Sequence, residues 1–232
     1  MDISVRTILT LALCAVFLVV GLPARAVDCR EATPDSLHNC LSSDGWKRKH
    51  TDDGLIIYSR SHSDSDVREV LATTRIRAPA HTILNTLTDF SHYTDFMPGT
   101  LELCEQLHHD GSDYWVFQQL DLPFVSDRYY TIHLQAKHNS ILPDWYVLEW
   151  TLADESQYQR KGSGQRVKFN NGYWSLREQP DGTTQVLYYI HTDPGRLWSW
   201  VVDFANSVAV PDVVNALKRQ YETSGNEGID TH

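Results

Sequence analysis

The chain has 232 residues, of which 41% are apolar, 22% charged and 11% aromatic, with 12 Gly, 9 Pro and 4 Cys. This composition excludes a disordered, a collagen-like and a disulfide-dense chain, and it predicts one globular domain. The formal charge of −10 and the pI of about 5.5 exclude nucleic acid as the main partner, because Lys and Arg are scattered and phosphate binding needs a coherent basic surface.

Residues 1–26 have the pattern of a secretory signal peptide. A short start with Arg6 precedes an apolar run over residues 8–22, and the string PARA, a small-x-small cleavage pattern, ends at Ala26. The apolar run is shorter than the roughly twenty residues that a membrane-spanning helix needs. We therefore expect cleavage after Ala26 and a periplasmic or secreted protein; an uncleaved membrane anchor is the alternative.

Three cysteines remain after that cleavage. Cys29 and Cys40 flank a short polar segment, and an oxidising compartment favours a disulfide between them that stabilises the protein by about 2–4 kcal/mol. Cys104 is then expected to be a buried free thiol. Because the sequence has no Cys-x-x-Cys redox motif, we interpret the bridge as a structural one that holds the N-terminal segment, residues 27–44.

The hydrophobic period changes along the next part of the chain. Residues 34–47 carry apolar side chains at helical spacing, with a break near Gly45, which predicts a short amphipathic helix. Residues 55–60 and 67–77 alternate between apolar and polar side chains, which predicts half-buried antiparallel strands.

A second helix is predicted where Pro79 stands at a tolerated first-turn position, and it ends at Pro98 and Gly99. Residues 101–190 have no long helical period, and turn signals separate their strand-like runs. This region therefore predicts an antiparallel meander.

Residues 196–221 form the most apolar predicted helix. In its first half a narrow polar stripe leaves most of the circumference apolar, so a concave partner must surround it. Pro211 removes one main-chain hydrogen bond and is expected to kink the helix. Either the helix faces a cavity or it packs against a curved sheet with no space between. Residues 222–232 are polar and predict a flexible tail.

The sequence has no motif for covalent or metal chemistry. Its 11 histidines lack the H-E-x-x-H spacing, so no metal ligand is assigned. The triplet Gly162-Ser163-Gly164 lacks the flanking pattern of a nucleophile elbow and predicts a hairpin turn. No Gly-rich phosphate loop follows a strand. We therefore assign no catalytic residue and expect no cofactor.

Five groups of residues occur in a distinctive order. They are Gly45 and Trp46 with Asp53, Gly54, Ile56, Tyr58 and Arg60; Ala78 and Pro79 leading to Asp89, Phe90, Tyr93, Met97 and Pro98; PFVSDRYY at residues 123–130; Gly172 to Trp174; and Asp193 to Gly195. Together they resemble the bacterial START domains, which are lipid-transfer domains related to steroidogenic acute regulatory protein. The resemblance covers about residues 45–220, and we expect the domain at 45–221. It implies an α+β helix-grip fold, a curved antiparallel sheet wrapped around a long C-terminal helix.

The resemblance also implies a hydrophobic cavity between sheet and helix that holds one lipid-like molecule. If Arg128 points inward, strand alternation nominates the wall of that cavity. The candidate ligand-binding residues are Tyr114, Val116, Gln118, Arg128, Tyr130, Ile132, Leu134, Tyr146, Leu148 and Trp150 on strands, with Leu197, Val201, Ala205 and Val208 on the helix. The expected partners are a lipid or other hydrophobic small molecule and, transiently, a membrane; the protein itself is expected to be a monomer.

One departure from the family pattern concerns charge inside the cavity. Some sterol-binding START domains carry an acid and a base that face each other, whereas the corresponding residues here are Gln118 and Leu134. This difference weakens a specific prediction of sterol. Arg128 is either a structural or rim residue, paired with Asp127 or another carboxylate, or a ligand for a lipid head group.

Residues 139–145 place Ile141, Leu142 and Pro143 between polar neighbours. We hypothesise that this segment is a lid that contacts a membrane during lipid uptake; an ordinary packed loop is the alternative. The sequence thus favours an exported, non-catalytic lipid-binding and lipid-transfer protein. The alternatives are a polyketide-cyclase-like enzyme that uses the same cavity and an exported interaction module with a filled core.

Overall fold

The computed structural model describes residues 29–52, 54–63, 65–122, 125–140, 142, 144–154, 158–193 and 209–222. The helical elements are η1 (Cys29–Glu31), α1 (Pro34–Ser43), α2 (Ala80–Thr88), η2 (Phe90–His92), α3 (Tyr93–Phe96) and α5 (Val210–Glu222). The strands are β1 (Lys47–Asp52), β2 (Leu55–His62), β3 (Ser65–Ile76), β4 (Leu101–Asp110), β5 (Asp113–Leu120), β6 (Arg128–His138), β7 (Trp145–Leu152), β8 (Gln165–Arg166), β9 (Phe169–Glu178) and β10 (Thr184–Asp193).

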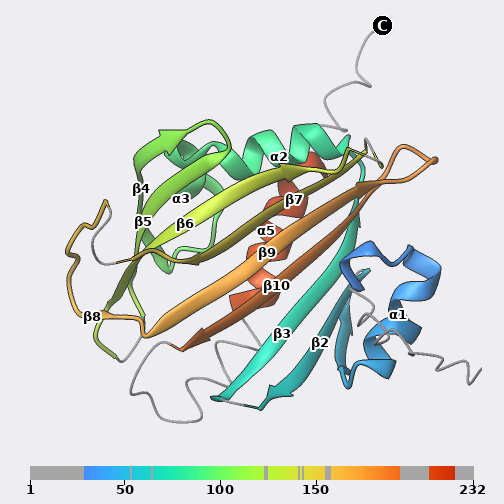
Figure 1. Cartoon of the computed structure of the whole chain (residues 1–232), viewed down its shortest axis with the longest axis horizontal. Coiled ribbons are helices and arrows are strands. Elements are labelled where there is room, and N and C mark those ends of the chain that lie inside the picture. The colour runs from blue at the N-terminus through green and yellow to red at the C-terminus, as the bar shows by residue number, and fades with distance from the viewer. Residues whose placement is uncertain are drawn as a thin grey trace, which may run out of the picture.

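Nine strands of the sheet follow the order β1-β2-β3-β10-β9-β7-β6-β5-β4, and all neighbours in this order pair antiparallel (Figure 1). The predicted meander accounts for most of this order. It does not account for β8, which pairs in parallel with β6, or for the junction at which β10 returns to β3.

Helices cover both faces of the sheet (Figure 1). We call the face that carries α2, α3 and α5 the inner face and the face that carries α1 the outer face. On the inner face Ile83 of α2 and Leu217 of α5, both fully buried, share one cluster with Leu176 of β9. On the outer face Leu37 and Leu41 of α1 pack with residues of β2, β3 and β10. The predicted α+β architecture is confirmed.

The N-terminal unit differs from the predicted helix over residues 34–47. Helix α1 ends at Ser43, and Gly45 adopts a φ of +80°, a left-handed conformation that glycine takes at little cost. The chain then enters β1, an edge strand that the sequence did not predict because its residues are basic rather than alternating. The disulfide between Cys29 and Cys40 is present and lies in the outer-face cluster, where it ties η1 to α1.

Basic side chains on β1 have a physical role at the sheet edge. Lys47, Arg48 and Lys49 are all exposed, and charged side chains on an edge strand oppose pairing with another chain.

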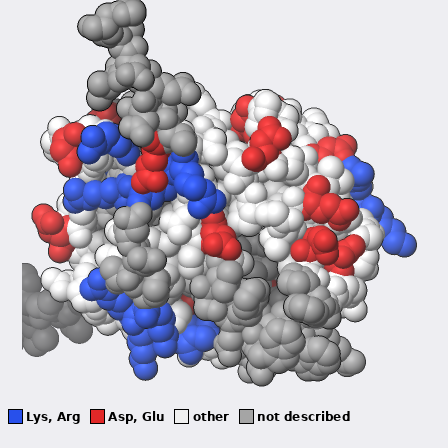
Figure 2. Space-filling view, turned by 180° about the vertical axis from the view of Figure 1, so that it is seen from behind, with Lys and Arg blue, Asp and Glu red and all other residues white. Residues whose placement is uncertain are grey.

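Seen from behind, Lys and Arg are interspersed with Asp and Glu in one half of the molecule, whereas Asp and Glu predominate in the other half (Figure 2). The net negative charge is therefore spread unevenly in space.

The second predicted helix is also revised, and the C-terminal one is described in part. The helix expected from Pro79 to Pro98 is interrupted at Asp89, whose φ of −89° and ψ of 72° are not helical, so that α2, η2 and α3 follow one another. Of the helix expected over residues 196–221, the structure describes α5 and Ala209, and α5 has Pro211 as its second residue. The predicted kink falls where part of the chain is not described and stays a prediction.

The prediction of a hairpin turn at Gly162-Ser163-Gly164 is wrong. These residues belong to the long connection between β7 and β9, which packs on the outer face of β5 and β6 before β8 forms. The Ser163 amide donates to Gln119 Oε1 at 2.9 Å, and the Ser163 hydroxyl donates to the Asp127 carboxylate. Gly162 and Gly164 are therefore explained by the contact of this connection with β5 and β6. Local turn preferences cannot predict a contact between residues so far apart in the sequence.

In the part of the chain that the structure describes, no helix has the length and apolar character needed to span a bilayer. The predicted signal peptide, residues 1–26, and most of the predicted tail lie outside the described residues.

Gly164 gives a test of this docking contact. A Cβ atom on Gly164 would lie 2.1 Å from the main-chain oxygen of Asp127, and its φ is +77°. Gly182 has a similar φ of +76° but open space around it, so it serves as the matched control. We expect Gly182→Ala to lower the free energy of unfolding by about 1 kcal/mol and Gly164→Ala by about 2–4 kcal/mol, measured by urea denaturation. Equal losses at the two positions would contradict the proposed close contact.

Candidate functional site

A row of hydrogen-bonded polar side chains crosses the inner face of the sheet. Cys104 on β4 pairs with Gln118 on β5, which pairs with Tyr130 on β6, so the three side chains share one face. The Tyr130 hydroxyl donates to Gln118 Oε1 at 2.7 Å, and Gln118 Nε2 lies 3.6 Å from Cys104 Sγ. We call Cys104, Gln118 and Tyr130 the polar row.

Asn170 and Trp150 extend this arrangement toward the centre of the sheet. The Trp150 Nε1–H donates to Asn170 Oδ1 at 3.0 Å, and Asn170 is close enough to Tyr130 to oppose slightly the rise of its pKa on burial. Trp150 pairs with Gly172 on β9, where a Cβ atom would lie 2.2 Å from the indole ring. Glycine at 172 therefore lets the indole lie across the sheet and reach Asn170.

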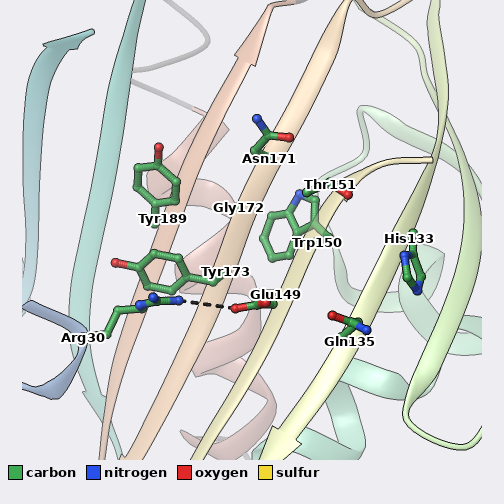
Figure 3. A pocket seen from close by; sticks show the side chains of 10 residues that line it. All are labelled: Arg30, His133, Gln135, Glu149, Trp150, Thr151, Asn171, Gly172, Tyr173 and Tyr189. Atoms are coloured by element: carbon green, nitrogen blue, oxygen red, sulfur yellow. Dashed lines mark hydrogen bonds and ion pairs between the residues drawn. The ribbon is translucent and has the colours of Figure 1, made fainter. Parts of the chain in front are cut away.

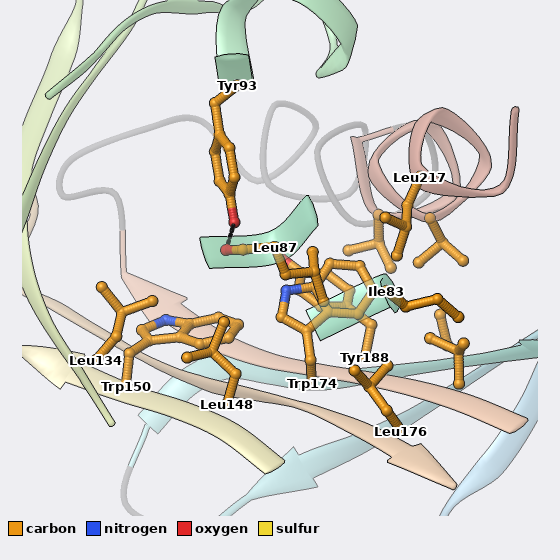
Figure 4. Close-up of a cluster of buried hydrophobic side chains, with 14 of the residues drawn as sticks. Ile83, Leu87, Tyr93, Leu134, Leu148, Trp150, Trp174, Leu176, Tyr188 and Leu217 are labelled. Atoms are coloured by element: carbon orange, nitrogen blue, oxygen red, sulfur yellow. Dashed lines mark hydrogen bonds between the residues drawn. The ribbon is translucent and has the colours of Figure 1, made fainter. Parts of the chain in front are cut away.

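Three aromatic side chains form the floor beside the polar row (Figure 4). The ring of Tyr188 on β10 lies 4.3 Å from that of Trp174 and 6.0 Å from that of Trp150, measured between centroids. Leu134 and Leu148 border these rings. The inner face thus offers a wide apolar surface with one narrow band of neutral hydrogen-bonding groups, which is the composition of a site for an amphipathic small molecule.

Burial changes the titration of these groups. Burial raises the pKa of the Tyr130 and Tyr188 hydroxyls well above the ordinary value of a tyrosine. Burial also raises the pKa of the Cys104 thiol to about 12, against a smaller opposing effect of its contact with Gln118. All three groups are therefore neutral at physiological pH, and their surroundings disfavour a negative charge.

Arg128 begins β6 and is almost fully buried, with 1% of its surface exposed. Its guanidinium donates to the main-chain oxygens of Ser126 and Asp127 and, at 3.1 Å, to the Ser126 hydroxyl. Burial lowers the pKa of Arg128, and the nearby charge of Asp127 opposes that shift. These contacts support the structural role that the sequence left open, because they brace the segment that leads into β6.

Most of the strand residues nominated for the cavity wall belong to the inner-face cluster, on the side of the sheet that carries α2 and α5. These residues are Val116, Tyr130, Ile132, Leu134, Leu148 and Trp150, which are buried, and Tyr114 and Tyr146, which are partly buried. Gln118 shares their face through its bond to Tyr130. Leu197, Val201, Ala205 and Val208 lie outside the described residues.

Sequence reasoning missed several members of this site. Tyr188 and Trp174 were not assigned to a face, because aromatic residues stand on both faces of β9 and β10 and the alternation there gives no preference. Cys104 was expected to be buried; the structure confirms that it is free and shows it partly buried. The pairing of Cys104 with Gln118 would have identified Cys104 as a member of this site. The register in which two strands pair cannot be read from one sequence.

A groove of about 200 Å³ lies on the outer face, between η1 and the strands β6, β7, β9 and β10 (Figure 3). Its charged groups already contact one another. Arg30 lies 3.3 Å from Glu149, which also pairs with Lys137, and the Arg30 guanidinium stands 5.1 Å from the centroid of the Tyr173 ring. The groove therefore differs from the inner face, where the polar groups are neutral.

The predicted lid is the loop between β6 and β7. Of its three apolar residues the structure describes Leu142, which is 39% exposed. The Leu142 amide donates to Asn139 Oδ1 at 2.9 Å, and the Trp145 amide donates to the Leu142 carbonyl at 3.0 Å. These two hydrogen bonds tie the main chain of Leu142 to both ends of the loop, and its side chain is exposed. Elsewhere among the described residues, no three His, Cys, Asp or Glu side chains are placed to hold a metal ion.

Comparison with known proteins adds to this geometry. No family model matches the chain. An uncharacterised protein from Pseudomonas aeruginosa is 29% identical over 182 residues, which cover 78% of this chain and 86% of that protein.

Solved structures share the fold of most of this chain. A STAR-related lipid transfer protein from Xanthomonas axonopodis has a TM-score of 0.69 and 22% identity, and covers 77% of this chain and 99% of its own. Human StAR-related lipid transfer protein 5 has a TM-score of 0.71 and 13% identity over 83% of this chain and 93% of its own. The Zhui aromatase/cyclase from Streptomyces has a TM-score of 0.50 and 16% identity over 71% and 99%. The chain therefore has the helix-grip fold of START domains, as its sequence motifs predict.

The raised pKa of Cys104 predicts slow alkylation. Because the pKa is about 12 in the folded protein and about 8.5 for an ordinary thiol, the reactive thiolate at pH 8 is scarce until the protein unfolds. We expect iodoacetamide to modify Cys104 at least about a hundredfold more slowly in the native protein than in 8 M urea, followed by peptide mass spectrometry without reductant. Similar rates in both conditions would show that the thiol is not shielded.

Proposed function

We propose that this protein binds one hydrophobic ligand between the inner face of the sheet and its C-terminal helix, and carries that ligand between membranes. The apolar inner face with its single band of neutral polar groups is the observation that supports the proposal most directly. The START fold supports it as well, since two of the proteins that share this fold are named as lipid transfer proteins.

The physical need for such a carrier comes from the solubility of lipids. Exposing a hydrocarbon chain to water costs about 0.8 kcal/mol per methylene group, so a lipid crosses an aqueous compartment only when it is shielded. A ligand that buries about 400 Å² of apolar surface gains up to about 10 kcal/mol, before the cost of ordering is subtracted. Binding alone can supply this gain, and no covalent step is needed.

Export belongs to the same proposal. The signal-peptide pattern over residues 1–26 supports a working protein in the periplasm or outside the cell, and cleavage after Ala26 would make Val27 its first residue. The bridge between Cys29 and Cys40 suits that compartment, because disulfides persist in oxidising surroundings. We expect the protein to act as a monomer that contacts membranes transiently.

A cyclase-like enzyme is the second candidate, because the polar row brings several side chains to one place and the Zhui aromatase/cyclase has a related fold. General acid–base catalysis works best when a group titrates near the operating pH. Burial instead raises the pKa of Tyr130, and that of Cys104 to about 12. The carrier function therefore suits these residues better.

The proposal predicts a lipid that accompanies the protein from its own host. We expect native mass spectrometry of the exported fraction to show a chain that starts at Val27 with one bound ligand, and organic extraction to release a lipid. The same protein should move a fluorescent lipid from donor to acceptor vesicles. Ligand-free protein that leaves the lipid in the donor vesicles would contradict the carrier, as expected for an interaction module with a filled core. Conversion of a bound polyketide would favour the enzyme.

The lid hypothesis is tested at the loop between β6 and β7. Replacing Ile141 and Leu142 by Asp is expected to lower liposome binding and vesicle-to-vesicle transfer by about tenfold or more, because the loop loses two apolar side chains and gains charge. Tyr158→Asp is the matched control, since Tyr158 is also exposed, at 46%. If the double variant transfers lipid as well as the control, the loop is an ordinary turn.

A further inference from the structure

Tyr188 places a hydroxyl group on the inner face, close to the polar row. Tyr188 is 7% exposed and stands between the rings of Trp150 and Trp174. Among the contacts that the structure describes, its hydroxyl has no hydrogen-bond partner, whereas Tyr130 donates to Gln118 and Tyr93 donates to the main chain of Leu87. This hydroxyl is therefore available to donate a hydrogen bond, and one such bond typically contributes about 0.5–1.5 kcal/mol.

The surroundings of Tyr188 specify which chemistry could satisfy it. Tyr188 is close enough to Tyr130 and Tyr93 to influence the titration of both, so the three phenol groups share one region. The polar row and Asn170 border the same region with neutral amide, thiol and hydroxyl groups. Arg128, the charged side chain nominated for this face, directs its guanidinium to main-chain oxygens of the segment before β6.

We propose that the site selects an uncharged amphiphile whose head carries a hydroxyl or carbonyl group, with Tyr188 as its hydrogen-bond donor and its hydrocarbon part against Trp150 and Trp174. This inference rests on the proposed lipid-binding function and narrows it to a ligand class. A phosphate or carboxylate head would lose its hydration beside neutral groups, which costs far more than the transfer of a hydroxyl that finds a partner. Selection among lipids then follows from head-group charge.

A series of single-chain probes tests the head group alone. The probes are 1-hexadecanol, palmitate and hexadecyl phosphate, which share a sixteen-carbon chain, and binding to the mature protein is followed at pH 8 by the change in its intrinsic tryptophan fluorescence. We expect hexadecanol to bind at least about tenfold more tightly than either anion, since burying an unpaired charge is far costlier than burying a paired hydroxyl. Equal or tighter binding of palmitate or hexadecyl phosphate would overturn the inference.

The variant Tyr188→Phe tests whether the Tyr188 hydroxyl donates a hydrogen bond to the head group of the ligand. Removing one hydrogen bond should weaken hexadecanol binding by about fivefold and leave palmitate binding unchanged. Tyr189→Phe is the matched control, because the neighbouring Tyr189 points to the outer face, where its hydroxyl donates to Glu69 at 2.8 Å. Unchanged hexadecanol affinity in Tyr188→Phe would remove Tyr188 from the site.

The outcomes separate this inference from the function on which it rests. If lipid co-purifies and all three probes bind alike, the carrier stands and the selection of neutral ligands is wrong. If no probe binds and no lipid co-purifies, the carrier itself is wrong. Should Tyr188→Phe fail to fold, which its melting temperature would reveal, the comparison of the three probes on the unaltered protein still decides the matter.

Discussion

Strand register is the constraint on which the inner face depends. Because side chains alternate along a strand, the pairing of Gln118 with Tyr130 turns both toward the helices, and a slip of one residue would replace them by their outer-face neighbours. The same register sets Tyr188 opposite Trp174. Neutral hydrogen-bonding groups therefore come together in one narrow band, although they come from strands far apart in the sequence.

The helices and the candidate site share one cluster on the inner face. Helix α5, with the fully buried Val214 and Leu217, packs mainly on β3, whereas α2, with the fully buried Ile83, packs on β7 and β9, which carry Trp150 and Trp174. On β4 and β5, by contrast, Cys104 and Tyr114 stay partly buried. The outer face adds two further supports, the disulfide-linked N-terminal unit and the connection that docks through Gly162 and Gly164. These supports hold the outer face of the sheet independently of the helices on its inner face.

The sequence predicted what depends on local pattern. Alternation along β6 predicted the inner side chains, and spaced motifs predicted the fold. It did not predict β1, whose run of basic residues has no apolar alternation, or the role of Gly164, whose contact with Asp127 joins residues far apart in the chain. Tyr188 was missed for a third reason: Tyr189 beside it is also aromatic, so composition could not show which of the two faces the helices.

The contact between Trp150 and Gly172 has a consequence for how this protein can vary. Any side chain at 172 would displace the indole and break its hydrogen bond to Asn170, while a smaller residue at 150 would leave a hole above the glycine. The two positions are therefore expected to change together in evolution. A lineage that lost the tryptophan could carry a larger side chain at 172, and the shape of the inner face would change with that exchange.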